Sequence, residues 1–111
     1  MAYKFLIKEC EDGYRFVLFP NNSNTQLIGE SIPYGSESEC VKELDHFRML
    51  VKTKEIELYV EDRNDVYCPS IIVDKQKMFM LERGYPHRRS ECISWLQRIR
   101  NNIDAPLKKH L

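Results

Sequence analysis

The sequence predicts an α+β fold made of two tandem repeats, each with three strands followed by one helix. Ser38-Glu39-Cys40 returns as Ser90-Glu91-Cys92, and each triplet opens a segment with the same apolar pattern. A spacing of i, i+4, i+7 and i+11 places four side chains in one stripe of an α-helix. Both segments have this spacing, and corresponding positions are 52 residues apart (92 − 40 = 52). The expected core positions are Cys40, Leu44, Phe47 and Val51 in the first helix and Cys92, Leu96, Ile99 and Ile103 in the second.

The chain of 111 residues has the length of one ordinary domain. We place repeat 1 at residues 1–53 and repeat 2 at residues 54–111 of a single domain, 1–111. A unit of about 50 residues buries little apolar surface by itself. The two repeats are therefore expected to fold against each other and to share one core.

The first repeat has clear signals for its strands and its helix. An Asp-Gly turn signal at Asp12-Gly13 predicts a hairpin, and Pro20–Asn24 predicts a loop. Ser36 is the expected N-cap of the helix, Glu39 completes a capping box, and the helix is expected to run to about Val51. The expected strands are Tyr3–Lys8, Tyr14–Phe19 and Thr25–Glu30.

The second repeat follows the same plan with different turns. Asp62–Asp65 predicts a longer turn than Asp12-Gly13, and Pro69 indicates a sheet edge or a bulge. Arg88 stands where the first repeat has Ser36, so the capping box is lost. The C-terminal segment Leu107–Leu111 is either an edge strand or a tail. The expected strands are Glu55–Val60, Val66–Val73 and Met78–Glu82.

Charge is distributed unevenly although the net charge is zero. Residues 1–74 carry 8 basic and 14 acidic side chains, whereas residues 75–111 carry 9 basic and 3 acidic ones. This pattern fits either attraction between the two parts, with ordinary solvated faces, or an anionic partner for the second repeat.

The sequence predicts a cytoplasmic protein without a cofactor. It has no apolar run of about 18 residues and no secretion signal at its start. Its four cysteines, Cys10, Cys40, Cys68 and Cys92, include no C-x-x-C pair. We therefore expect four thiols, no metal site and no membrane partner.

Several short segments together resemble a known family. They are Asp12-Gly13-Tyr14-Arg15-Phe16-Val17-Leu18, Leu27-Ile28-Gly29-Glu30-Ser31, Tyr34-Gly35-Ser36, Met80-Leu81-Glu82, Tyr85 and Asn102 through Pro106. This pattern is similar to that of the YegP-like domains of unknown function, which have tandem β3-α-β units. The second repeat departs from the family pattern, because it lacks the Asp-Gly and Arg-Phe elements and has His87-Arg88-Arg89 in place of the serines.

The resemblance has consequences for the fold and none for chemistry. It implies that the two units build one antiparallel sheet, exchange their last strands and lay both helices on one face. The family offers no established activity to transfer to this chain.

No catalytic constellation is visible in the sequence. It contains no G-x-S-x-G, H-E-x-x-H or glycine-rich phosphate loop. His46 is expected to be a partly exposed helix residue, because the adjacent Asp45 cannot face it on a helix. The acidic run Glu55, Glu57, Glu61, Asp62 and Asp65 is typical of a solvated face or of a guarded strand edge.

The most suggestive polar residues are basic and lie in the second repeat. They could meet a phosphate near the N-terminus of the second helix, with Tyr85 and Trp95 as stacking faces. Against this, Trp95 lies beside the apolar stripe, where large aromatic residues are usually core or subunit contacts. The candidate anion-binding or nucleic-acid-binding residues are Arg83, Tyr85, His87, Arg88, Arg89, Arg98, Arg100, Lys108 and Lys109.

These observations favour a non-enzymatic binding or assembly module whose partner is another protein or a second copy. The alternative is a nucleic-acid or phosphate-ligand binder that uses the basic surface of the second repeat. Nucleic-acid-binding proteins tend to carry net positive charge, and this chain is neutral.

Overall fold

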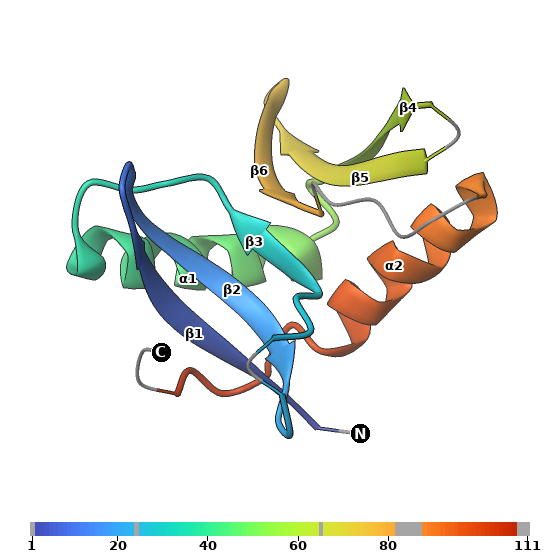
Figure 1. Cartoon of the computed structure of the whole chain (residues 1–111). Helices are drawn as coiled ribbons and strands as arrows, with labels where there is room; N and C mark the ends of the chain where they lie inside the picture. The colour runs from blue at the N-terminus through green and yellow to red at the C-terminus, as the bar shows by residue number, and fades with distance from the viewer. Residues whose placement is uncertain (1, 24, 65, 82–87, 109–111) are drawn as a thin grey trace.

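The computed structural model describes residues 2–23, 25–64, 66–81 and 88–108. It contains one six-stranded antiparallel sheet with the strand order β1-β2-β3-β6-β5-β4 (Figure 1). The predicted α+β class is therefore confirmed. The elements are β1 (Tyr3–Cys10), β2 (Gly13–Pro20), β3 (Gly29–Ser31), α1 (Glu37–Lys52), β4 (Glu57–Arg63), β5 (Val66–Val73), β6 (Gln76–Met80) and α2 (Arg89–Asn101).

The first hairpin turns where the sequence predicts it. β1 and β2 pair up to Cys10 and Gly13, and Gly13 has a φ of 134°. A Cβ at Gly13 would lie 2.3 Å from the carbonyl oxygen of Tyr34. Tyr34 and Tyr14 exchange two backbone hydrogen bonds at this point. Glycine is therefore required at this position both for the turn and for the close approach of Tyr34.

The second hairpin differs from the prediction. The expected longer turn, Asp62–Asp65, is wrong, because β4 and β5 pair up to Arg63 and Val66, which leaves two residues between them as in the first hairpin. Asn64 has a φ of 54°, a conformation that asparagine tolerates better than most residues. Asp65 lies outside the described residues.

Pro69 lies in the interior of the sheet, so the predicted sheet edge is wrong. β5 is flanked by β4 and β6, and the register shift that the sheet does contain falls between Ile71 and Ile72. The Pro69 carbonyl accepts a hydrogen bond from the Leu81 N–H at 3.0 Å. The missing donor of Pro69 therefore faces the point just beyond Met80, where β6 ends. Proline fits here because the neighbouring strand stops.

The two helices begin differently, as the sequence predicts. The Ser36 hydroxyl accepts a hydrogen bond from the Glu39 N–H, and the Glu39 carboxylate accepts one from the Gly35 N–H. Arg88 has the same extended backbone at the start of α2 but makes no side-chain cap. The described chain contains no helix long and apolar enough to cross a membrane.

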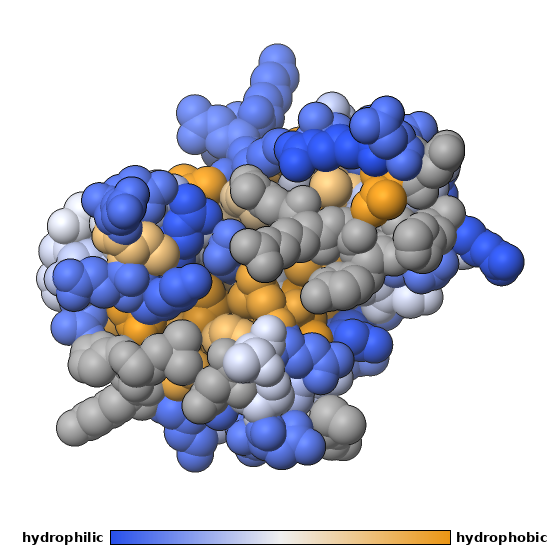
Figure 2. All heavy atoms as spheres, viewed as in Figure 1, coloured by the Kyte–Doolittle hydropathy of each residue, from blue (hydrophilic) through white to orange (hydrophobic). Residues whose placement is uncertain are grey.

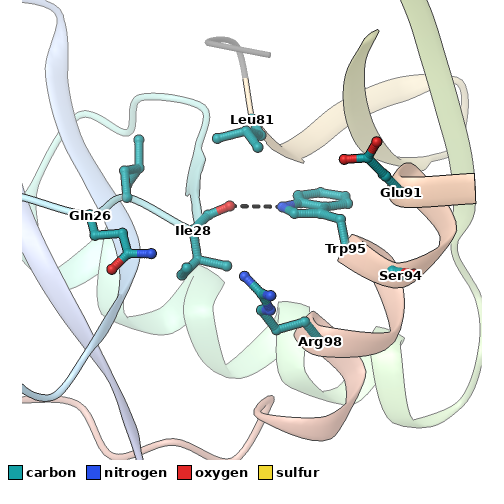
Figure 3. A pocket seen from close by; sticks show the side chains of 8 residues that line it. Gln26, Ile28, Leu81, Glu91, Ser94, Trp95 and Arg98 are labelled. Atoms are coloured by element: carbon teal, nitrogen blue, oxygen red, sulfur yellow. Dashed lines mark hydrogen bonds between the residues drawn. The ribbon is translucent and has the colours of Figure 1, made fainter. Parts of the chain in front are cut away.

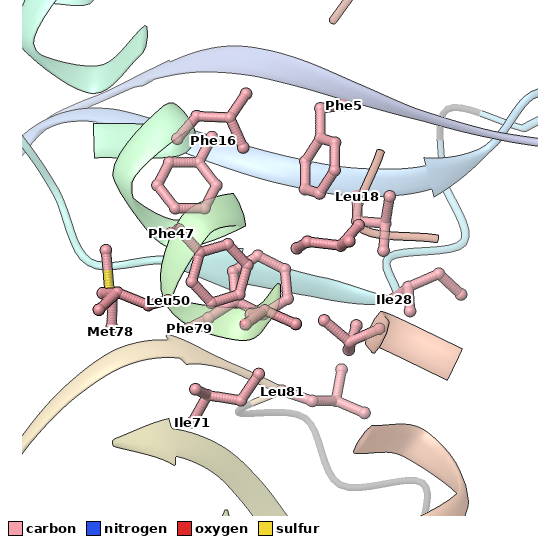
Figure 4. Packing of buried hydrophobic residues seen from close by; sticks show 14 of the residues in the cluster. Phe5, Phe16, Leu18, Ile28, Phe47, Leu50, Ile71, Met78, Phe79 and Leu81 are labelled. Carbon is pink, nitrogen blue, oxygen red and sulfur yellow. The ribbon is translucent and has the colours of Figure 1, made fainter. Parts of the chain in front are cut away.

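Both helices pack into one hydrophobic cluster with the sheet (Figure 4). All eight stripe side chains are buried, from Cys40 to Val51 in α1 and from Cys92 to Ile103 in and just after α2. Four aromatic rings form the centre of the cluster: Phe16 from β2, Phe47 from α1, Phe79 from β6 and Trp95 from α2. A smaller apolar group of Leu6, Val17 and Phe19 lies on the opposite face of the sheet.

The chain after α2 returns to the other end of the sheet. Phe5 in β1 donates its N–H to the Pro106 carbonyl and accepts a hydrogen bond from the Lys108 N–H, both at 2.9 Å. This contact forms one parallel bridge between Phe5 and Leu107. Arg48 in α1 holds the same segment, because its guanidinium donates to the carbonyl of Ile103 at 3.1 Å. Of the segment Leu107–Leu111, predicted to be an edge strand or a tail, the last three residues lie outside the described chain.

Gly29 tests how tightly the aromatic cluster is packed. A Cβ at Gly29 would lie 2.3 Å from the Phe79 ring, whereas a Cβ at Gly35 would meet only the Glu39 carboxylate at 3.4 Å. We expect Gly29→Ala to lower the free energy of unfolding by about 1–3 kcal/mol, because the buried ring must move. Gly35→Ala is the matched control and should change stability by less than about 0.5 kcal/mol. Urea unfolding checks both, and equal stabilities for the two variants would contradict the packing.

The two helix starts give a second, reciprocal test. Ser36→Ala should lower the free energy of unfolding by about 0.5–2 kcal/mol, because it removes the cap of α1. Arg88→Ser should raise it by about 0.5–1 kcal/mol, since residue 88 already has the backbone conformation of an N-cap. Thermal unfolding measured by circular dichroism checks both signs. A destabilised Arg88→Ser protein would show that Arg88 makes a contact worth more than a cap.

Candidate functional site

The candidate site is a pocket of about 640 Å³ between α2 and the chain that leads into β3 (Figure 3). One wall is a face of α2, and the other wall is formed by residues before β3 and just after β6. Apolar residues gather in the middle of this side of the molecule, between hydrophilic margins (Figure 2). The described lining residues are Gln26, Leu27, Ile28, Leu81, Glu91, Ser94, Trp95 and Arg98.

The α2 wall follows from helical geometry. Glu91, Ser94, Trp95 and Arg98 are spaced at i, i+3, i+4 and i+7, so they lie on one face of the helix. This face adjoins the buried stripe that begins at Cys92. The helix can therefore bury its stripe in the core and still present these four side chains to the pocket.

Trp95 is fixed at the base of the pocket. Its indole N–H donates to the carbonyl oxygen of Ile28 at 2.7 Å, and its ring stacks on Phe79 with 6.3 Å between the ring centroids. The side chain is 6 % exposed. The hydrogen bond joins the two walls of the pocket directly, so the spacing between α2 and the β3 segment is set by one buried contact.

Two opposite charges border the pocket. Arg98 and Glu91 lie about 10 Å apart along the helix axis. Neither forms an ion pair within the described residues, and both are exposed. The guanidinium of Arg98 projects towards Ile28 and Gln26 (Figure 3). The pocket thus offers a cation beside Leu27, Ile28 and the Trp95 ring.

Those of the predicted anion-binding residues that the structure describes do not gather in one place. Four of the predicted set, Arg83, Tyr85, His87 and Lys109, lie outside the described residues. Arg98 follows Arg89 by nine residues, which is about 13 Å along the helix and half a turn around it. Arg88 and Arg89 are therefore at one end of α2, and Arg98 is near the other end on a different face. Lys108 lies beside β1.

The remaining basic residues have local structural surroundings. The guanidinium of Arg89 lies over the ring of Tyr67 at 5.5 Å from its centroid. Arg100 is partly buried, and its Nε has no hydrogen-bond partner among the described residues. Arg88 is exposed at the helix start. Of the nine predicted residues, Arg98 is the described one that lines the pocket.

Sequence reasoning missed most of the pocket. The sequence does contain a signal for the α2 wall, because Glu91, Ser94, Trp95 and Arg98 form a polar and aromatic stripe beside the apolar one. The sequence contains no such signal for the opposite wall, since Gln26, Leu27 and Ile28 lie in a segment whose pattern predicts an ordinary strand. That segment becomes a wall because its Ile28 carbonyl accepts the Trp95 hydrogen bond.

Side chains elsewhere show no catalytic arrangement within the described chain. His46 is exposed on α1, with its Nδ1 3.4 Å from the Glu43 carboxylate. Burial raises the pKa of the Cys40 thiol to about 11, so this thiol is a weak nucleophile at neutral pH. The four cysteines are thiols. Among the described residues, no three His, Cys, Asp or Glu side chains come close enough to hold a metal ion.

The described residues of the acidic run in and before β4 do not line the pocket. Glu61 pairs with Arg63 at 2.8 Å and lies 3.8 Å from Lys77. The hydrogen bond from Arg63 lowers the pKa of Glu61. Glu55, Glu57 and Asp62 are exposed, as expected for a solvated face.

These features define an α+β protein with one antiparallel sheet, a shared core and a pocket beside its second helix. The same fold occurs in YegP from E. coli, a protein of unknown function, with a TM-score of 0.75 and 18 % identity over 98 % of this chain and 93 % of that one. A UPF0339 protein from Shewanella oneidensis gives a TM-score of 0.73 and 13 % identity, over 98 % of this chain and 92 % of its own. The resemblance to the YegP-like fold is therefore confirmed. No family model and no curated protein matches the sequence.

Trp95→Phe tests the contact that joins the two pocket walls. The variant keeps an aromatic ring but leaves the Ile28 carbonyl without the indole N–H. We expect the free energy of unfolding to fall by about 1–3 kcal/mol. Urea unfolding followed by circular dichroism measures it. Ile93→Ala, at a position 56 % exposed on α2, is the control and should change stability by less than about 0.5 kcal/mol. Equal losses in the two variants would contradict the role of the hydrogen bond.

Proposed function

We propose that this protein is a binding module rather than an enzyme, and that the pocket beside α2 is its ligand site. The observation that carries the proposal is Arg98. It is a cation without an ion-pair partner among the described residues, and it projects into a pocket with a fixed tryptophan at its base. A charged group beside apolar walls makes stronger electrostatic contacts than one in open water.

The scaffold of this module is, in our proposal, a duplicated unit. The sheet reads β1-β2-β3 from one edge and β4-β5-β6 from the other, and the two series meet where β3 pairs with β6. Each series is followed in the chain by one helix that begins near a Ser-Glu-Cys triplet. This arrangement supports two repeats within one domain.

The pocket favours a small organic anion as the ligand. Leu27, Ile28 and Leu81 offer apolar contact, and the aromatic side chain of Trp95 also lines the pocket. Arginine binds carboxylate and phosphate groups through charge-assisted hydrogen bonds. The ligand class is therefore a molecule with an apolar or aromatic body and one carboxylate or phosphate group.

The lining residues support binding over catalysis. Among the described lining residues, Ser94 supplies the hydroxyl group. Its Oγ donates a hydrogen bond to the Ser90 carbonyl within the helix at 3.3 Å. A serine nucleophile needs an adjacent base, and the described lining contains no histidine. Arg98 and Gln26 are groups that hold a ligand rather than groups that transfer a proton at neutral pH.

Nucleic-acid binding is the alternative, and Arg88 and Arg89 at the uncapped start of α2 favour it. A helix start with outward-facing N–H groups and two arginines suits a phosphate. Against it, Trp95 is buried and hydrogen-bonded, so its ring cannot stack on a base. We also keep the expectation that the protein is cytoplasmic and that its partner is another protein or a second copy.

The single tryptophan of the chain makes the pocket measurable. Phenyl phosphate should change the Trp95 fluorescence and bind with a Kd in the millimolar range or below, whereas neutral benzyl alcohol should bind more weakly. Arg98→Gln should lower the affinity for phenyl phosphate by about tenfold or more, because one charge-assisted contact is lost. Fluorescence titration measures both ligands.

Arg88→Gln is the matched control, since it removes the same charge at the start of α2, outside the pocket. Its affinity for phenyl phosphate should equal that of the unchanged protein. Equal losses in Arg98→Gln and Arg88→Gln would mean that the general charge of α2, not the pocket, binds the anion. Salt-sensitive binding of a single-stranded oligonucleotide that is lost in Arg88→Gln, without binding of phenyl phosphate, would support the alternative instead.

A further inference from the structure

The two edges of the sheet are occupied differently. β1 and β4 are the edge strands. In β1, Phe5 is bonded by the segment Pro106–Lys108 through two backbone hydrogen bonds of 2.9 Å. Among the described residues, no segment makes a backbone hydrogen bond to the outer edge of β4. The described sheet therefore has one edge that receives an added segment and one that does not.

The register of β4 shows which of its backbone groups point outward. Pro69 directs its carbonyl towards Leu81, so Pro69 and its partner in β4, Val60, form a pair without mutual hydrogen bonds. Such pairs alternate along an antiparallel ladder. The backbone groups that point away from β5 are therefore the N–H and C=O of Leu58, Val60 and Asp62.

The side chains on the face of β4 away from the helices carry balanced charge. Glu57 and Glu61 are acidic, Arg63 at the end of the strand is basic, and Lys77 of β6 reaches the same face. Arg63 donates to the Glu61 carboxylate at 2.8 Å, and the Lys77 ammonium lies 3.8 Å from it. Between the two glutamates lies Tyr59, which is 46 % exposed. This face is therefore neutral as a whole, with an acidic residue at one end and a basic one at the other.

A second copy can pair with β4 in one register that suits these charges. Around a twofold axis, residue i of one copy meets residue j of the other, and j meets i. Antiparallel pairing centred on Val60 overlaps all seven residues of both strands and places Glu57 opposite Arg63 at both ends. A centre at Tyr59 would place Glu57 opposite Glu61, and a centre at Glu61 would place two copies of Glu61 opposite each other. Like charges at opposite positions repel, so the centre at Val60 is favoured.

The other groups of the strand are compatible with this pairing. Val60 exchanges two backbone hydrogen bonds with its counterpart on the axis, and Leu58 does the same with Asp62 of the other copy. The two Tyr59 side chains lie diagonally across the axis, within reach of each other. The two Asp62 residues are about 13 Å apart along the strands. This separation exceeds the Debye length of about 10 Å in roughly 0.1 M salt, so their repulsion is screened.

We propose that two copies of this protein associate through the outer edges of β4, antiparallel and centred on Val60, so that their two six-stranded sheets become one continuous sheet. The edge fits its own copy because its face is neutral and its two ends, Glu57 and Arg63, are complementary to each other. A contact of one strand from each copy is small, so the dimer is reversible, with a Kd of about 100 µM or below. This surface is separate from the pocket, and the dimer does not depend on the ligand of the pocket.

Sedimentation analysis of the whole chain tests the dimer. The unchanged protein should pass from monomer to dimer as its concentration rises to about 1 mM. Val60→Pro removes an outward N–H and no bond to β5, so the fold should be retained, which circular dichroism checks. The self-affinity of this variant should fall by about tenfold or more. An unchanged protein that stays monomeric, or a Val60→Pro protein that dimerises equally well, would overturn the proposal.

Charge reversal tests the register. Glu57→Arg alone places two arginines opposite each other at both ends, and Arg63→Glu alone places two glutamates there. Each variant by itself should dimerise about tenfold or more weakly. An equimolar mixture of the two should form a heterodimer, because both ends then pair opposite charges. A mixture that dimerises no better than its components would overturn the proposed pairing.

Two controls and one further readout complete the experiment. Glu11→Arg makes the same charge change at the exposed turn between β1 and β2, and it should leave dimerisation unchanged. Arg98→Gln, which alters the pocket, should also leave it unchanged. In hydrogen exchange, the amides of Leu58 and Val60 should become protected as the protein concentration rises, whereas the Tyr59 amide, which bonds to β5, should be protected throughout. Exchange at Leu58 and Val60 that does not depend on concentration would contradict the paired edge.

Discussion

The fold depends on the ring of Phe79. It is fully buried and stacks on Phe16, Phe47 and Trp95, so one side chain of β6 contacts β2 and both helices. Its edge rests where Gly29 has no side chain. Because β3 and β6 are the strands that join the two ends of the sheet, this ring lies at the junction of the whole structure. The space around it fixes how closely the strands and helices approach.

The pocket is a consequence of that junction. The Phe79 ring stacks on Trp95, and the Trp95 indole N–H donates a hydrogen bond to the Ile28 carbonyl. These two contacts set the distance between α2 and the segment before β3. The stripe of α2 fills the core, and the neighbouring face is left to line a cavity with Arg98 and Glu91 at its margins. The pocket that we propose as a ligand site therefore follows from core packing rather than from a separate loop.

The two edge strands of the sheet, β1 and β4, have different surroundings. At β1 the returning chain and Arg48 cover the strand, and Arg48 also lies over the Phe5 ring at 5.2 Å from its centroid. At β4, no segment of the described chain makes a backbone hydrogen bond to the outer edge of the strand.

The sequence alone determined the two helices and the first hairpin, because local rules decide them. The spacing of Cys40, Leu44 and Phe47 predicts a helical stripe, and Asp12-Gly13 predicts a tight turn. The capping difference between the two helices follows from the side chains of Ser36 and Arg88. Tertiary structure decided the rest. Pro69 entered the interior of the sheet because β6 ends beside it, and Trp95 became the base of a pocket because Ile28 supplied an acceptor 67 residues away. Contacts between distant segments depend on how the elements pack, and no local pattern records them.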